Sequence, residues 1–94
     1  MIIHTHLFAT FRLVAGVKSI DLDLPQCATL LEAVQQIAGL YPVIRPHWLD
    51  ANGELHAHVH IFHNSEDFAL LPAGLHTILL PGDTLEFFPP VAGG

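Results

Sequence analysis

Positively charged residues are scarce in this chain. Its 94 residues include three Lys and Arg but nine Asp and Glu, which gives a formal net charge of −6 at pH 7. Nucleic-acid binding depends on clustered Lys and Arg side chains that neutralise phosphates, so this composition argues against nucleic acid as a partner. An acidic surface is instead suited to a protein partner that presents a basic docking face.

Cysteine and long apolar runs are also nearly absent. Cys27 is the only cysteine, so no disulfide can form within the chain, and we expect a reducing, cytoplasmic location. The first residues, Met1 to His4, lack a basic segment followed by a long apolar one, so no secretory signal is evident. No run approaches the roughly 20 apolar residues that a membrane-spanning helix needs. We therefore expect a cytoplasmic protein that has no membrane partner.

The length of the chain predicts a single domain over residues 1–94. Hydrophobic residues make up 51% of the sequence, enough for one core without disulfides or metals. No internal repeat, low-complexity tract or linker is present. Within this single domain, we expect residues 89–94 to form an extended tail.

Alternating apolar and polar residues predict most of the secondary structure. We expect strands at residues 3–11, 20–24, 54–61, 68–71 and 84–88, with turns at 15–18, 64–67 and 81–83. Residues 29–32 match a capping box, in which Thr29 and Glu32 bond to each other's backbone. Apolar residues at helical spacing follow it, so we expect a helix from residue 30 to residue 39 or 40.

This order of elements predicts an α+β fold, with one main helix packed on one face of a mixed sheet. The first and last strands would lie side by side at the centre of the sheet, which is the β-grasp (ubiquitin-like) arrangement. Residues 41–53 form a connection near the upper end of ordinary loop lengths. We expect Trp48, within it, to cover an edge of the core.

The last residues, Gly93 and Gly94, form a thin segment without side chains. Such a segment can enter a tunnel that would exclude any Cβ atom, and glycine tolerates the backbone angles that a tunnel imposes. Pro89 and Pro90 fix φ and favour an extended exit from the fold. The pattern predicts chemistry at the Gly94 carboxylate itself.

Three motifs together resemble one family. They are the segment Leu7–Arg12, the turn at Gly82 and Asp83, and the ending Phe87–Gly94. The chain resembles the ubiquitin-like sulfur carrier proteins of the MoaD/ThiS family, and the resemblance extends over nearly the whole sequence. The combination of the turn and the tail is specific to that family, whereas the N-terminal motif is less so.

The resemblance implies a two-step activation by a partner. An E1-like enzyme adenylates the Gly94 carboxylate with ATP, and a sulfur donor then displaces AMP to leave a thiocarboxylate. The chain itself would bind no cofactor and would supply no catalytic side chain, so it is expected to be a carrier and not an enzyme. By this resemblance, Gly93 and Gly94 would be the residues at which this chemistry takes place.

The resemblance leaves the recipient of the sulfur open. The ending is similar to that of MoaD, the small subunit of molybdopterin synthase, whose large subunit (MoaE-like) would receive the tail. The 41–53 connection and the 64–67 turn are more similar to carriers for cysteine biosynthesis (CysO type), whose partner is a cysteine synthase. Attachment to lysines as a protein modifier and a role as an interaction module are further alternatives.

Exposed aromatic residues near the tail suggest a docking surface. Phe8 and Phe88 point to the same face of the predicted sheet; burial by the long connection or by a second copy is an equally good interpretation. Arg12 falls on that face and is either an interface residue or simply solvated. The residues expected to bind partners are Phe8, Phe87, Phe88, Pro89, Pro90, Val91 and Ala92.

Histidine is abundant, with eight residues. The predicted strands place five of them around Glu86 on the open face of the sheet: His4, His6, His56, His58 and His60. Three imidazoles can hold zinc, but alternate residues of one strand lie about 6.5 Å apart. We therefore expect no bound metal, and interpret these residues as polar side chains on a solvated or partner-facing surface.

Overall fold

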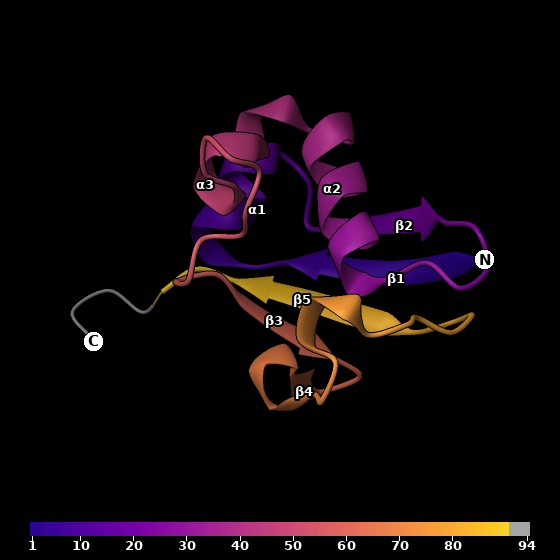
Figure 1. The fold of residues 1–94 in the computed structure, drawn as a ribbon. Coiled ribbons are helices and arrows are strands. Elements are labelled where there is room, and N and C mark those ends of the chain that lie inside the picture. Colours follow the sequence, from indigo (N-terminus) through magenta and orange to yellow (C-terminus); the bar gives the residue numbers. More distant parts are fainter. Residues whose placement is uncertain (91–94) are drawn as a thin grey trace.

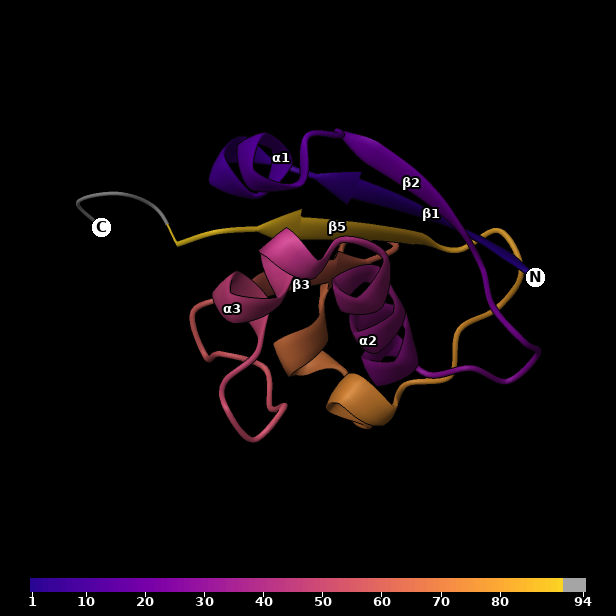
Figure 2. The same ribbon diagram turned by 90° about the horizontal axis from the view of Figure 1, so that it is seen from above.

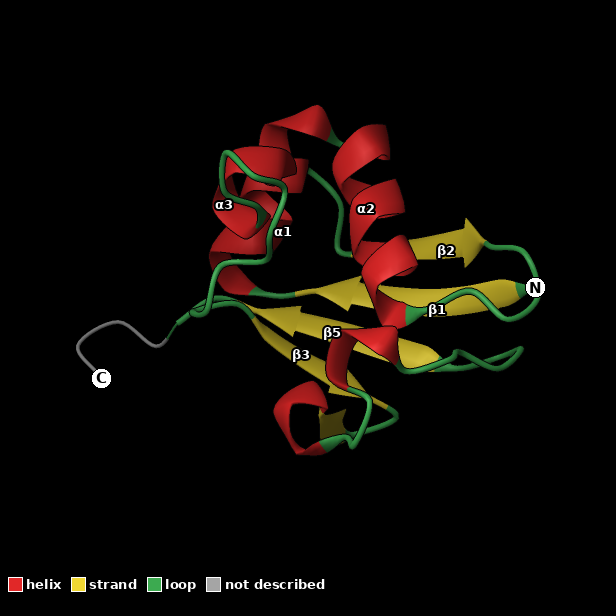
Figure 3. Ribbon diagram, in the orientation of Figure 1, coloured by secondary structure: helices red, strands yellow, loops and turns green. Residues whose placement is uncertain are grey.

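The computed structural model describes residues 1–90, and a five-stranded mixed sheet is its central element (Figures 1 and 3). The strand order is β2-β1-β5-β3-β4, in which β1 and β5 run parallel and the other neighbours antiparallel. The strands are β1 Ile2–Leu7, β2 Ser19–Asp23, β3 His60–His63, β4 Glu66–Asp67 and β5 Thr84–Phe88. The first and last strands therefore lie side by side at the centre, as predicted.

The helices α1, α2 and α3 cover one face of this sheet (Figures 1 and 2). They span Ala9–Ala15, Leu30–Leu40 and Arg45–Trp48, and the short 3₁₀ helices η1, η2 and η3 span Pro42–Ile44, Phe68–Leu70 and Gly74–His76. The predicted α+β, β-grasp architecture is confirmed. Its consequence for function is that these three helices leave the other face of the central strands uncovered.

The helix α2 begins and ends where the sequence predicts. The Thr29 side chain accepts a hydrogen bond from the Glu32 backbone N–H at 3.2 Å, so it caps the first turn. Five residues of the helix are buried and face the sheet. Pro42 stops the helix, because it has no N–H to donate and because it disfavours helical angles in the residue before it.

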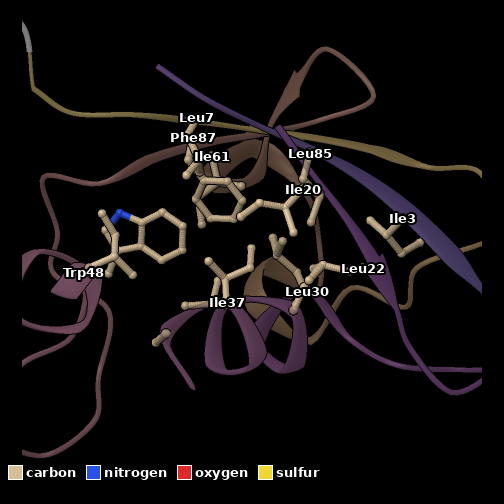
Figure 4. Close-up of a cluster of buried hydrophobic side chains, with 14 of the residues drawn as sticks. Ile3, Leu7, Ile20, Leu22, Leu30, Ile37, Trp48, Ile61, Leu85 and Phe87 are labelled. Atoms are coloured by element: carbon tan, nitrogen blue, oxygen red, sulfur yellow. The ribbon is translucent and has the colours of Figure 1, made fainter. Parts of the chain in front are cut away.

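The hydrophobic core fills the space between the sheet and the helices (Figure 4). Trp48 is 0% exposed and stacks on Phe87 of β5, with ring centroids 4.3 Å apart and planes 12° apart. Phe11 of α1 meets the edge of the same indole at 5.6 Å. The predicted role of Trp48 as a core residue is confirmed. Its burial holds the 41–53 connection against the core.

The prediction of one strand over residues 3–11 is wrong in its second half. The strand β1 ends at Leu7, and residues 9–15 form α1, which ends at Gly16 with a left-handed φ of 79°. Phe11 is the buried residue of that helix. Apolar residues here fit helical spacing as well as alternation, and packing on Trp48 selects the helix. The antiparallel β1–β2 pair was predicted, but a helix joins its strands instead of a short turn.

The predicted strand over residues 54–61 is also mostly wrong. The strand β3 covers only His60–His63, while Leu55 makes an isolated bridge with Leu49. The His56 N–H donates to the Trp48 carbonyl at 2.8 Å and the Val59 N–H to the His56 carbonyl at 3.1 Å, which bends this segment into a turn. The alternation in 54–59 therefore reflects packing of an irregular segment against the core.

The predicted short strand at 68–71 is a 3₁₀ helix, η2. The strand β4 instead occupies Glu66–Asp67 and pairs with β3 through a tight hairpin. Asn64 and Ser65 form its two-residue turn with φ of 49° and 71°, the left-handed values that such hairpin turns require. The predicted turn at 64–67 is thus two residues shorter than expected.

Candidate functional site

The strand β5 leads from the centre of the sheet to the tail. It pairs with β1 on one side and β3 on the other, and its Phe87 side chain is fully buried against Trp48. Figure 2 shows that the last described residues, after the end of this strand, lead away from the sheet. Pro89 is half-buried and Pro90 exposed. The other predicted tail residues lie outside the described residues: Val91, Ala92, Gly93 and Gly94.

Three aromatic side chains surround the point where the tail begins. The rings of Phe8 and Phe88 are stacked, with centroids 4.3 Å apart and planes 9° apart. Phe62 of β3 meets Phe88 edge-to-face at 5.6 Å. The Phe8 N–H donates to the Phe87 carbonyl at 3.1 Å, which ties this residue to the end of β5. We call Phe8, Phe62 and Phe88 the aromatic cluster.

A shallow apolar groove of about 400 Å³ adjoins the aromatic cluster, lined by His60, Phe62, Phe88 and Pro89. The structure therefore brings together Phe8, Phe88 and Pro89, which the sequence predicts as docking residues. It adds Phe62, which the prediction missed because the expected strand ended at residue 61. Phe87, also predicted as a docking residue, points the other way into the core, so its side chain is not accessible to a partner.

The opposite end of β5 is held by a polar network centred on Asp83, which is 8% exposed. The Asp83 carboxylate accepts hydrogen bonds from His63 Nε2 at 2.7 Å, Asn64 Nδ2 at 3.0 Å and the Leu80 N–H at 2.9 Å. Asn64 Oδ1 in turn accepts from the Thr84 N–H at 2.9 Å. The network ties the β3–β4 turn to the start of β5.

The charge of Asp83 depends on this network. Burial raises the pKa of the carboxyl, but the hydrogen bonds from Asn64, His63 and the Leu80 N–H lower it more, so that its pKa lies below the usual 3.8. Sequence reasoning assigned no role to His63 or Asn64. The available signal was an Asp directly after the Pro81–Gly82 turn, a position from which a carboxylate readily bonds nearby backbone.

The predicted ring of five histidines around Glu86 does not form. His4 and His6 lie on the open side of β1, and the register places His6 beside Glu86. His56 and His58 lie outside β3 and stack on each other at 5.0 Å. Among residues 1–90, no group of three or more His, Cys, Asp or Glu side chains is placed to hold a metal ion.

None of the helices in residues 1–90 combines the length and the apolar character that crossing a membrane requires.

Comparison with known proteins identifies the family. The protein-family model described as "ThiS family" matches residues 5–94 of this chain. Small archaeal modifier protein 1 of Haloferax volcanii is 34% identical over 88 residues, which cover 94% of this chain and 95% of the relative. Its crystal structure has a TM-score of 0.90 at 31% identity, with all of both chains covered.

Two further relatives lie close to this chain in sequence or structure. Small archaeal modifier protein 3 of the same organism is 34% identical over 94 residues, covering 100% of both chains. The crystal structure of the BexX/CysO complex of Amycolatopsis orientalis gives a TM-score of 0.79 at 27% identity, with 98% of this chain and 99% of that one covered. The chain therefore belongs to the ThiS family of small ubiquitin-like proteins, which are carriers or modifiers and not enzymes.

Proposed function

We propose that this protein is a sulfur carrier whose Gly94 carboxylate is adenylated by an E1-like enzyme with ATP and then converted to a thiocarboxylate. The observation that carries the proposal is the way the tail is attached. Its first residues, Pro89 and Pro90, follow directly from the central strand β5, whose Phe87 is fixed in the core. The body of the domain thus holds the tail by its central strand.

The chemistry of this proposal needs no side chain from the carrier. A carboxylate is a poor electrophile, whereas its mixed anhydride with AMP has a good leaving group. Attack by a sulfur donor on that anhydride releases AMP and leaves sulfur bound to the Gly94 carbonyl. Because Gly93 and Gly94 have no Cβ atoms, this end of the chain can reach a narrow active site in a partner.

The recipient we propose is the large subunit (MoaE-like) of molybdopterin synthase. The support is the Phe87–Gly94 ending, which is similar to that of the small subunit MoaD. The aromatic cluster and groove at the start of the tail would dock on that subunit while the tail enters it. Delivery to a cysteine synthase, as in CysO-type carriers, remains the alternative within sulfur transfer.

Attachment to lysine amines as a protein modifier is the second candidate function. It is favoured by a specific observation, the 34% identity to two proteins that are named small archaeal modifiers. The activation step is shared, since an amine and a sulfur donor attack the same adenylate. The two functions differ only in the nucleophile, so they can be separated by the product.

The test is intact-mass spectrometry after incubation with an E1-like enzyme, ATP and sulfide. We expect a mass gain equal to the replacement of one oxygen by sulfur, located at Gly94. The chain lacking Gly94, and a chain with one added C-terminal alanine, should show no gain while unfolding at the same temperature as the wild type. Sulfur incorporation into either variant would contradict the proposal. Gly94 linked to lysines of other proteins in cells would favour the modifier.

A further inference from the structure

The strand β2 forms one edge of the sheet, and its outer side has no neighbouring strand (Figure 1). Within residues 1–90 it pairs with β1 alone, in an antiparallel register. The strand at the opposite edge, β4, is only the two residues Glu66–Asp67, so β2 is the edge long enough to accept a further strand.

Hydrogen bonds at both ends of the β1–β2 pair show which residues of β2 turn outward. The Leu24 N–H donates to the Met1 carbonyl, and the Leu7 N–H to the Lys18 carbonyl, each at 2.9 Å. Both bonds continue the register of the pair, and the backbone groups of successive residues in a strand point to alternate sides. Even-numbered residues of β2 thus bond to β1. The residues whose N–H and C=O groups point away from the sheet are Ser19, Asp21 and Asp23.

Only one of these outward backbone groups is bonded in the part of the chain that the structure describes. The Gln36 side chain of α2 donates to the Asp23 carbonyl at 3.3 Å. The remaining outward N–H and C=O groups of β2 have no hydrogen-bond partner there. A row of unpaired backbone groups on an edge strand is a template for pairing with another chain.

The side chains along this edge are negatively charged on one face. Asp21 and Asp23 lie on the open face of the sheet, and their side chains are 70% and 83% exposed. Asp21 contacts only the half-exposed His4 ring, and Asp23 only the terminal amine of Met1 at 3.3 Å. Both carboxylates are therefore accessible to cationic side chains of a partner.

We propose that the outer edge of β2 binds an extended, basic segment of a protein partner, which becomes a sixth strand of the sheet. Backbone hydrogen bonds to β2 supply the affinity of such strand addition, and side chains supply its specificity. Here Lys or Arg side chains of the segment lie beside Asp21 and Asp23. The inference goes beyond the proposed function, because this partner does not receive the tail.

Charge makes a second copy of this chain a poor occupant of the edge. Two antiparallel β2 strands in full overlap would place Asp21 of one copy opposite Asp21 of the other, and like charges directly opposite each other are destabilising. Each copy also has a net charge of −6. The carboxylates thus oppose pairing of the chain with itself and favour a basic segment.

The edge lies apart from the beginning of the tail. The strand β1 separates β2 from β5. Asp23 pairs with Ile2 at the far end of β1, whereas Phe87, next to the tail, is in register with Leu7 at the near end. A partner held on the β2 edge therefore leaves the tail free to enter another protein.

The probe is a fluorescently labelled seven-residue peptide of alternating Val and Lys, and binding is measured by fluorescence anisotropy. We expect it to bind, and the same peptide with Glu in place of Lys not to bind. Asp21→Asn and Asp23→Asn should each weaken binding about threefold, as expected for an exposed cross-strand charge pair, and added salt should weaken it further. The matched control is Glu66→Gln, which changes the net charge equally on the opposite edge and should leave binding unchanged.

Strand addition is separated from simple charge attraction by methylating backbone nitrogens of the peptide. One peptide is methylated at two Lys residues and another at two Val residues. Since only one of these sets of N–H groups faces β2, we expect one peptide to lose binding and the other to keep it. Amide hydrogen exchange followed by NMR should show slower exchange at the Asp21 and Asp23 N–H groups with bound peptide, and no change at Ile20 and Leu22, which already bond to β1.

Four results would each overturn the proposal. They are no binding of the Lys peptide, equal binding of the Glu peptide, equal losses for Asp21→Asn and Glu66→Gln, and equal effects of the two methylations. Sedimentation of the protein alone adds a check on self-association. A dimer in which the Asp21 N–H is protected from exchange would assign the edge to a second copy and overturn the proposal as well.

Discussion

Replacing Asp83 by Ala tests whether the polar network holds the start of β5. The substitution removes the acceptor for three hydrogen bonds, from His63, Asn64 and the Leu80 N–H. The donors come from the end of β3, from the β3–β4 turn and from the segment before β5. Without the carboxylate, the β3–β4 turn keeps only its hydrogen bonds between Asn64 and Thr84.

The expected loss of stability follows from the number and kind of these bonds. A hydrogen bond to a charged group contributes about 1.5–3 kcal/mol to stability. Two of the donor residues, Asn64 and Leu80, are exposed, so the freed donors regain part of their bonding from water, and we expect a total loss of about 3 kcal/mol. For a domain of this size, that corresponds to a fall in melting temperature of about 12–24 °C.

The matched control is Asp21→Ala, which also breaks a carboxylate–histidine pair. His4 Nδ1 and Asp21 Oδ1 lie 2.9 Å apart, but the two side chains are 48% and 70% exposed. Exposed pairs contribute little, so we expect a loss below about 1 kcal/mol. Both variants are measured by urea unfolding followed by circular dichroism. Equal losses for the two variants would show that burial of the Asp83 network does not stabilise the fold.

The pH dependence of the free energy of unfolding gives the same experiment a second readout. The pKa of Asp83 in the folded protein lies below its usual value of 3.8, so folding favours the charged carboxylate. Its contribution is therefore fully present above pH 3.8 and is lost as the pH falls through the lower folded pKa. We expect the stability gap between the wild type and Asp83→Ala to be constant near neutral pH and to narrow in acid. A gap that widens in acid would refute the reasoning.

Two further predictions concern the packing that supports the sheet. Thr29→Ala removes the cap of α2 and should cost about 1 kcal/mol in urea unfolding, whereas Thr29→Ser, which keeps the hydroxyl, should cost much less. Trp48→Ala should cost about 3–5 kcal/mol, because it empties the space against Phe87 and Phe11; a loss below 1 kcal/mol, read from thermal unfolding by circular dichroism, would place the indole outside the core.

The parts of the fold that could be predicted from the sequence are those whose signals are local. The helix α2 has its cap at Thr29 and its stop at Pro42, each of which acts on the neighbouring backbone. The strand β5 follows a Pro-Gly turn and alternates cleanly between buried and half-buried residues. In both cases the local sequence is enough to predict the element, since tertiary packing agrees with the local backbone preference.

The wrong predictions arise where packing decides between two local possibilities. Residues 9–11 continue the alternation of the first strand, yet they begin the helix α1, in which Phe11 packs against Trp48. Residues 54–59 alternate too, but the His56 N–H bonds to the Trp48 carbonyl instead of to a neighbouring strand. Both segments thus contact Trp48, whose position in the fold no local sequence pattern predicts.

The candidate site shows the same division. Phe8 and Phe88 could be predicted to lie together, because the central pairing of the first and last strands places them side by side. Phe62 could not, since its place depends on where β3 begins and ends. Arg12 and Lys18 line the same surface hollows, which the sequence also did not predict, because Arg12 lies on α1 and not on the predicted strand. An error in a predicted strand or helix therefore leaves residues out of the predicted site.

Both ends of β5 are tied to neighbouring segments, so in the proposed function the tail can be used without loosening the domain. At its start, Asp83 ties the strand to the β3–β4 turn, and at its end the Phe8–Phe88 stack ties it to β1. Between them the strand has hydrogen-bonded neighbours on both sides. Central strands of this kind open only at a free energy near that of global unfolding. A partner that pulls on the residues after Phe88 therefore meets the stability of the whole fold, whereas a tail attached to an edge strand such as β4 would meet only the stability of one hairpin.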